Sequence, residues 1–314
     1  MIGRRTVLTA VPALVIAAAT KRAAAAPAKL LRVGFQKGEP ILLAARQDRR
    51  LETMLQPLGI DVQWIEFEFG PPMLEAMRAN AIDIGAVGDT PPVFAQAAHA
   101  DLLYIAAQRA GGQAILVPPG SHLQTLQDLK GRKLAFGRGS SAHDLVLAAL
   151  EKAGLKYTDI QPVYLGPADA GPAFEHGAID AWSIWDPYYA LFETRPGVRV
   201  LAKWTDIGEQ NSFFLGQRGY VEANPDVTAK VVGEFTSVAE WARSHRADVA
   251  ALLAAATGMP IDAVRRGVDR DPFVVLPVDD EVVRIQQKVA DRFSALGLIP
   301  TPIRVSDQVW RAGA

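Results

Sequence analysis

The segment KLAFGRGSSAHDL, residues 133–145, carries residue types from which proteins build anion sites. A strand-like apolar run ends at Gly137 and Gly139, and a helical pattern starts through Ser140 and Ser141. A glycine turn before a serine-started helix leaves backbone N–H groups free to donate to an anion, and the helix dipole favours negative charge there. Plain capping by the serines uses the same N–H groups, so it stays open as an alternative.

The same segment fits two enzymatic patterns only in part. GRGSSA has the dinucleotide-binding spacing G-x-G-x-x-[GA], but the next expected strand, 160–166, ends without the acidic residue that would hold a ribose. Ser141 and His143 suggest a nucleophile and a base, but residues two apart do not share a helix face, and the chain has no G-x-S-x-G elbow. We therefore expect no cofactor and no catalytic residue.

A second helix start of this kind occurs at GDTPP, residues 88–92. Thr90 is placed to cap a helix, and the prolines after it have no N–H to lose in the first turn. A tight turn without a ligand is the alternative for Gly88, Asp89 and Thr90. Two such helix starts, one in each of two expected lobes, predict that both face one cleft.

Two further segments place polar or aromatic side chains next to expected strand ends. GFQKGEP puts Gln36 and Lys37 just past a strand, and Lys37 offers a positive charge. DAWSIWDPYY carries Trp185 beside Asp186, where an indole could form the wall for an apolar tail, whereas Trp182 is expected in the core.

Composition excludes several classes of function. The 314 residues are 49% hydrophobic and 21% charged with a net charge of −1, and no basic stripe suggests nucleic-acid binding. The chain has no cysteine, which excludes disulfides, thiolate metal sites and a lipid-anchoring cysteine. The histidines show no metal-binding spacing and stand at His99, His122, His143, His176 and His245.

Strand and helix patterns alternate along the chain, which predicts an α/β fold with a mainly parallel sheet. The alternation starts again near residue 113, and a strand at 211–221 returns to the first unit. Helical patterns follow at 227–245, 247–258 and 279–297. We expect two lobes joined by two crossings, with the ligand cleft between them.

The lobe boundaries follow from this pattern. Lobe 1 is expected at 27–113 and 214–314, and lobe 2 at 114–213. Residues 1–26 read as an export signal, with Arg4 and Arg5 before a short apolar run and small residues at its end. The paired arginines suggest the twin-arginine route to the periplasm, and an uncleaved anchor is the alternative.

The chain resembles the aliphatic sulfonate-binding proteins of bacterial ABC transporters in four segments. These are GSSAHDLVLAALEKAG…IDAWSIWDPY, VGFQKG, GDTPPVFAQAAHADLLYIA and KVADRFSALGLIPTPIRV. The resemblance runs through nearly all of the chain after the signal. It implies a two-lobed periplasmic binding protein of type II, a monomer, that hands its ligand to a membrane permease driven by an ATPase. The implied cleft contacts are Gln36, Lys37, Gly88, Asp89, Thr90, Ser140, Ser141, His143, Trp185, Asp186 and Asn211.

The resemblance leaves the ligand and two roles open. Helix-start N–H groups and hydroxyls can donate to a sulfonate, and Arg138 adds charge if it turns inward. Asp89 and Asp186 repel an anion, so they orient donors or meet the cation of a zwitterion such as taurine. Nitrate or another small solute is an alternative ligand, and an enzyme resembling those of thiamine-pyrimidine synthesis is the alternative outside the binding class.

Overall fold

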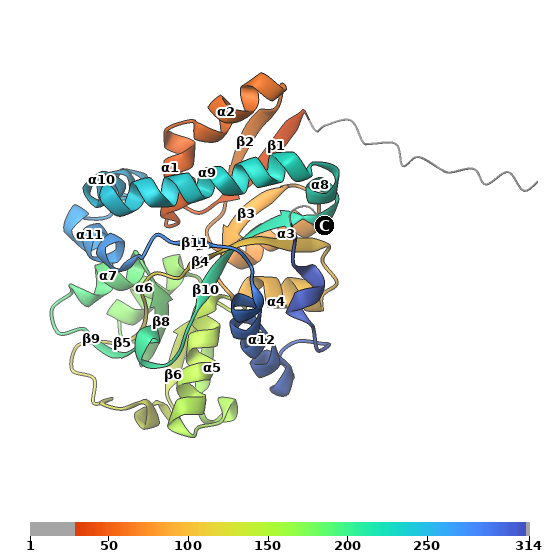
Figure 1. Ribbon diagram of the computed structural model, residues 1–314. Helices are drawn as coiled ribbons and strands as arrows, with labels where there is room; N and C mark the ends of the chain where they lie inside the picture. The colour runs from red at the N-terminus through yellow and green to blue at the C-terminus, as the bar shows by residue number, and fades with distance from the viewer. Residues whose placement is uncertain (1–28, 312–314) are drawn as a thin grey trace, which may run out of the picture.

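The computed structural model describes residues 29–311, which form two sheets with helices on both faces (Figure 1). The expected export signal lies outside these residues. In the described part of the chain, the first sheet has the strand order β11-β4-β10-β3-β1-β2, and the second has the order β7-β6-β8-β5-β9. The strands of the first sheet are β1 (Leu30–Phe35), β2 (Asp61–Glu66), β3 (Ile84–Val87), β4 (Leu102–Arg109), β10 (Asn211–Gln217) and β11 (Val275–Leu276). Those of the second are β5 (Gln113–Val117), β6 (Lys133–Phe136), β7 (Gln161–Tyr164), β8 (Ala181–Trp185) and β9 (Arg199–Lys203).

Both sheets are mixed, so the expectation of a mainly parallel sheet is wrong. Strand β1 pairs in parallel with β2 and β3, whereas β10 runs antiparallel to β3 and β4. Strand β6 pairs in parallel with β7 and β8, whereas β5 runs antiparallel to β8 and β9. Parallel neighbours need a long crossover connection. The chain reaches β5 and β10 through short segments that pass from sheet to sheet, and both strands enter in the reverse direction.

Two segments cross between the sheets, at 110–112 and 204–210. All strands between them belong to the second sheet, and the strands outside them belong to the first. The exact lobe boundaries expected from the sequence stay a prediction. The expected strand at 211–221 is shorter than predicted, because the Gln217 side chain accepts from the Tyr220 N–H at 2.8 Å and starts a helix there.

Helices cover both faces of the first sheet and give it two cores. One core contains residues of α1, α2, α9, α10 and α11, and the other contains residues of α3, α4 and α12. Period-two alternation divides β10 between them, because Phe214 lies in the first core and Phe213 and Leu215 in the second. The helices around this sheet are α1 (Pro40–Gln47), α2 (Arg50–Leu55), α3 (Gly70–Arg78), α4 (Thr90–Ala97), α8 (Arg218–Ala223), α9 (Pro225–Ser244), α10 (Arg246–Thr257), α11 (Ile261–Arg270) and α12 (Asp280–Ala295).

The second sheet is covered in the same way. Its helices are α5 (Ser141–Ala153), α6 (Pro167–Glu175) and α7 (Tyr188–Glu193). Helix α5 packs on one face, and α6 and α7 pack on the other, where Trp182 is 1% exposed as expected for a core residue. Within residues 29–311 no helix combines the length and the apolar character that a membrane span requires.

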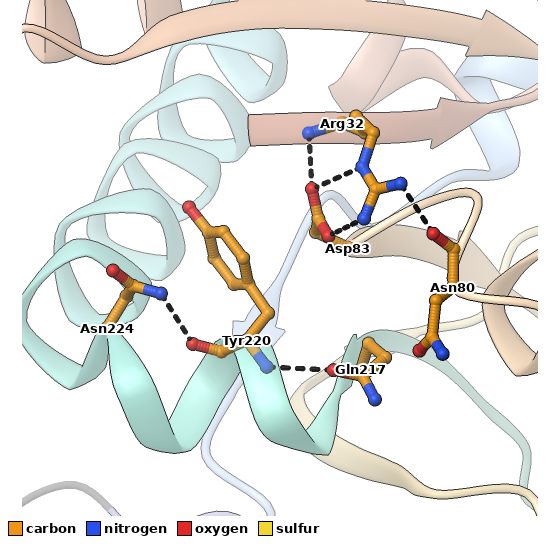
Figure 2. A network of polar contacts seen from close by, with 6 residues as sticks. All are labelled: Arg32, Asn80, Asp83, Gln217, Tyr220 and Asn224. Atoms are coloured by element: carbon orange, nitrogen blue, oxygen red, sulfur yellow. Dashed lines mark hydrogen bonds and ion pairs between the residues drawn. The ribbon is translucent and has the colours of Figure 1, made fainter. Parts of the chain in front are cut away.

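An ion pair joins β1 and β3 where these parallel strands begin (Figure 2). Arg32 donates through Nη2 to Asp83 Oδ1 at 2.5 Å and through Nε to Oδ2 at 3.0 Å, and its backbone N–H donates to Oδ2 as well. Asp83 is 4% exposed, so three donors satisfy a buried carboxylate. This contact fixes the two strands whose other ends carry Gln36, Lys37 and Gly88.

Candidate ligand-binding site

A cavity of about 460 Å³ lies between the two sheets beside the crossing at 110–112. Its walls include the loops after β1, β3 and β8 and the residues that start α5. This is the edge at which open α/β sheets bind ligands. The expected contacts that line it are Gln36, Lys37, Gly88, Ser140, Ser141, Trp185 and Asp186. Asp89, Thr90, His143 and Asn211 do not line it.

The start of α5 presents backbone donors to this cavity. Ser140 precedes the helix in an extended conformation, but its hydroxyl donates to the Gly137 carbonyl at 2.7 Å and caps no helix N–H. Gly139 has φ +71, a left-handed conformation that glycine adopts without strain, and lets the chain turn into the helix. First-turn N–H groups have no carbonyl four residues back. The capping alternative for Ser140 is therefore wrong, and the N–H groups beside Ser141 stay available to an anion.

The first lobe approaches the start of α5 at Gly88, which directly follows β3. A Cβ atom on Gly88 would lie 2.9 Å from both Cβ and Oγ of Ser141. The two residues therefore touch across the cleft, and the loop after β3 and the start of α5 face the same cavity.

Thr90 does not cap α4. It is the first helical residue, it is 0% exposed, and its hydroxyl donates to Asp89 Oδ1 at 2.9 Å. Asp89 does not line the cavity, and Gln210 of the second crossing donates to its Oδ2 at 2.9 Å. Gln113 donates in turn to Gln210 at 2.9 Å, so a chain of side chains joins the first sheet to the second. Burial and the nearby carboxylate of Asp144 raise the pKa of Asp89 well above its ordinary value.

His143 lies in an aromatic cluster on the far side of the α5 start. Its ring stacks on Phe136 with 4.7 Å between centroids, and its Nδ1 accepts from the Gly139 N–H at 3.3 Å. Burial, with a contribution from Arg138, lowers the pKa of His143 to about 3, so the imidazole is neutral. Arg138 itself is exposed and lies over the Tyr164 ring, outside the cavity, so it adds no charge there.

Asn211 starts β10 and supports the crossing. It is 1% exposed, and its Oδ1 accepts from Arg109 at 3.3 Å. Its neighbour Ser212 lines the cavity instead.

Two expected contacts at the end of β1 have partners within their own lobe. Gln36 donates through Nε2 to the Ala86 carbonyl at 2.9 Å, which fixes its side chain beside β3. Lys37 forms an ion pair with Glu66 at 3.0 Å, and its side chain is 47% exposed. Because Glu66 offsets the charge of Lys37, backbone and hydroxyl donors carry most of the anion recognition that this cavity can provide.

Asp186 lines the cavity with both carboxylate oxygens already engaged. Arg270 of α11 donates to Oδ2 at 3.0 Å and to Oδ1 at 2.9 Å, and it also binds Glu193 at 2.6 Å. Burial raises the pKa of Asp186, while Arg270 opposes that shift. The contact joins a helix of the first lobe to α7 of the second. Gly267 makes room for it, since a Cβ there would lie 3.2 Å from the Asp186 carboxyl carbon.

Four further carboxylates line the cavity and were not expected from the sequence: Glu39, Glu66, Glu68 and Asp271. Glu39 caps α1, with its Oε2 accepting from the Leu42 N–H at 2.6 Å, and burial raises its pKa to about 7. Asp271 follows α11 and accepts from the Phe273 N–H at 2.8 Å, and burial raises its pKa to about 6. Within residues 29–311 no group of His, Cys, Asp and Glu is arranged to hold a metal ion.

Helices α10 and α11 contribute a wall that the sequence interpretation missed. Leu253, Met259, Val264 and Val268 line the cavity, and the expected helices left 261–270 unassigned. The segment IDAVRRGVDR carried a signal, because Pro260 precedes it and Val264 and Val268 stand four residues apart.

Comparison with known proteins places this architecture in a family. Residues 49–211 match the family model described as the phosphonate periplasmic substrate-binding protein of ABC transporters. An aliphatic sulfonates-binding protein of Escherichia coli is 42% identical over 292 residues, covering 92% of this chain and 91% of that protein. The chain belongs to the aliphatic sulfonate-binding proteins.

Solved structures of this family have the same fold. The periplasmic aliphatic sulphonate binding protein SsuA from Escherichia coli matches with a TM-score of 0.83 at 42% identity, covering 90% of this chain and 92% of that one. The alkanesulfonate-binding protein SsuA from Xanthomonas axonopodis pv. citri, bound to MOPS, matches with a TM-score of 0.87 at 40% identity, covering 92% of this chain and 100% of that one. The two-lobed α/β fold is thus confirmed. The family consists of binding components of ABC transporters, so this chain is a binding protein and not an enzyme.

Proposed function

We propose that this protein captures an organic sulfonate between its lobes and delivers it to an ABC importer. The observation that carries the proposal is the uncapped start of α5 at the cavity, with the Ser140 hydroxyl turned to Gly137. A sulfonate presents three oxygens and one negative charge, which suit several N–H donors and a helix dipole better than a single lysine does. The sulfonate-binding relatives support the same class of ligand.

Capture follows from the contacts across the cleft. The sulfonate would accept from the start of α5 in the second lobe. Its organic part would lie against Trp185 of the same lobe and against the walls that the first lobe provides. A ligand that touches both lobes stabilises the closed form in proportion to the contacts that only this form provides. Asp89 and Asp186 orient other groups in this scheme, because Thr90, Gln210 and Arg270 already bind their oxygens. No bond of the ligand is made or broken.

Calorimetric titration of the protein without residues 1–26 tests the ligand class. The panel holds ethane-, butane- and octanesulfonate, butanephosphonate, taurine, nitrate and sulfate in a buffer free of sulfonates. We expect binding of the alkanesulfonates, and a loss of about tenfold or more in a Ser141→Ala/Lys37→Ala variant. The Ser306→Ala/Lys230→Ala variant is the control, because both of its positions are exposed and lie outside the cavity.

The panel also separates the alternatives. Binding of taurine or nitrate alone would keep the fold and replace the ligand, and silence across the panel would overturn the proposal. Sedimentation of the same sample tests the monomer that we propose, and exchange of Arg4 and Arg5 for lysines, followed by localisation in cells, tests the twin-arginine route.

A further inference from the structure

The carbon part of a bound sulfonate needs an apolar surface, and α10 and α11 provide one. Leu253 lies near the end of α10, Met259 lies in the turn after it, and Val264 and Val268 lie one turn apart on α11. Residues four apart project from one helix face, so both valines face the cavity together. Leu253, Val264 and Val268 are 4%, 1% and 3% exposed, whereas Met259 is half-buried. Met259 is therefore the member of this wall that a ligand can reach and displace.

The wall is fixed against the second lobe. Gly267 of α11 packs on Asp186, and Arg270 of the same helix binds Asp186 and Glu193. These contacts hold α11 beside α7 at the edge of the cavity. A tail that lies on the wall is therefore enclosed by both lobes, and its burial belongs to the closed form.

Carboxylates stand next to the wall. Asp271 follows α11 directly, and Glu39 lies near it, since the charge of Asp271 contributes to the raised pKa of Glu39. Both line the cavity. An uncharged tail meets no repulsion there, whereas a second anionic group at the end of the tail would lie near two carboxylates.

We propose that the wall of Leu253, Met259, Val264 and Val268 receives the organic tail, and that Met259 sets the length of the tail that fits. This inference rests on the proposed sulfonate-binding function. A thioether side chain suits the role, because it is unbranched and adapts its shape to its neighbours. The wall and its carboxylates together favour monosulfonates with uncharged tails over disulfonates.

The test is the change in affinity with chain length, measured by calorimetry with ethane-, butane-, hexane- and octanesulfonate. In the natural protein we expect about a fourfold gain in affinity for each CH₂ that reaches the wall. Met259→Trp fills the tail space, so we expect octanesulfonate to lose at least tenfold while ethanesulfonate changes less than twofold. Met259→Ala enlarges the space, so we expect the length of tightest binding to increase. Butane-1,4-disulfonate should bind at least tenfold more weakly than butanesulfonate.

Ile261→Ala is the control, because Ile261 starts the same helix, is half-buried and does not line the cavity. Its ratio of octane- to ethanesulfonate affinity should equal that of the natural protein. The same ratio in both Met259 variants would overturn the inference. Absence of any sulfonate binding by the natural protein would instead refute the proposed function, so the two failures are distinguishable. Circular dichroism and thermal unfolding check that each variant is folded, and Met259→Ala keeps the test decisive if the tryptophan variant does not fold.

Discussion

Gly88 and Ser141 touch across the cleft, and the space between them is too small for a methyl group. A Cβ on Gly88 would lie 2.9 Å from Ser141 Oγ, closer than carbon and oxygen approach without bonding. Gly88 follows β3 of the first sheet directly, and Ser141 starts the helix whose N–H groups face the cavity. This contact between the lobes therefore depends on a glycine in one lobe and a small residue in the other.

Gly88→Ala should weaken ligand binding without unfolding either lobe. The added methyl group clashes only when the lobes meet, and overpacking of this kind costs about 1–3 kcal/mol. Calorimetry should show a lower affinity for butanesulfonate, with the thermal midpoint of the ligand-free protein changed by less than 2 °C (about 0.5 kcal/mol). The matched test is Ser141→Gly with and without Gly88→Ala. Because Ser141→Gly removes the clashing atoms, Gly88→Ala should cost little in that background, and additive losses would refute the steric explanation.

The pair of Asp186 and Arg270 should act as one unit. Asp186→Asn and Arg270→Gln each leave a partly buried charge with a weakened partner, so each should lower stability by about 1–3 kcal/mol. In a double-mutant cycle the combined loss should be well below the sum of the single losses. Thermal unfolding measures this coupling.

The same variants decide the second role considered for Asp186. If its carboxylate met the cation of a zwitterion, Asp186→Asn alone would shift the preference between taurine and ethanesulfonate. We expect Asp186→Asn and Arg270→Gln to change that preference equally, because the carboxylate is already bound at both oxygens. A selective effect of Asp186→Asn would return the zwitterion role to this residue.

The sequence was informative where a residue's chemistry is decided by its neighbours along the chain. Ser140 and Ser141 at the start of α5, and Gly88 after β3, line the cavity as the sequence predicts. Their positions follow from strand ends and helix starts, which are local features. The same reasoning put Gln36 and Lys37 at the carboxyl end of β1.

The side-chain directions that the sequence left open or did not predict depend on partners far away in the sequence. The direction of Asp89 is decided by Gln210, and that of Asp186 by Arg270. His143 faces an aromatic cluster built from both lobes, with Phe293 at 4.9 Å and Phe136 at 4.7 Å between ring centroids. Gln210, Arg270 and Phe293 lie 121, 84 and 150 residues along the chain from the residues they contact, and so leave no periodic signal near them. These directions could therefore not be predicted.

Asp83→Asn should lower stability and leave ligand binding unchanged. The variant removes the charge that three donors of Arg32 bind at the beginning of β1 and β3 (Figure 2). Loss of this partly buried pair should cost about 1–3 kcal/mol, measured by denaturant unfolding. Affinity for butanesulfonate should stay within twofold, because Asp83 lies at the end of the sheet opposite the cavity. Asp101→Asn is the control. The side chain of Asp101 is 64% exposed where it pairs with Arg218, and exposed pairs of this kind contribute little to stability.

Glu39 should make both stability and anion binding depend on pH. Burial raises its pKa in the folded protein to about 7, above the value of 4.5 that the group has otherwise. The folded state thus binds this proton more tightly, and the stability that the neutral carboxyl provides is present below about pH 4.5 and lost as pH rises to about 7. A sulfonate in the same cavity adds a negative charge and favours the protonated form further. Affinity for butanesulfonate should therefore fall between pH 6 and pH 8, with uptake of protons on binding at pH 7. Calorimetry in buffers of different ionisation enthalpy measures that uptake.

Glu39→Gln should remove most of the pH dependence while keeping an oxygen that accepts from the start of α1. Glu222→Gln changes an exposed residue and should not remove the pH dependence. If Glu39→Gln kept the pH profile of the natural protein, the dependence would belong to Asp271 instead of Glu39. Because the pKa of Asp271 is about 6, the fall in affinity would then lie about one pH unit lower in both proteins.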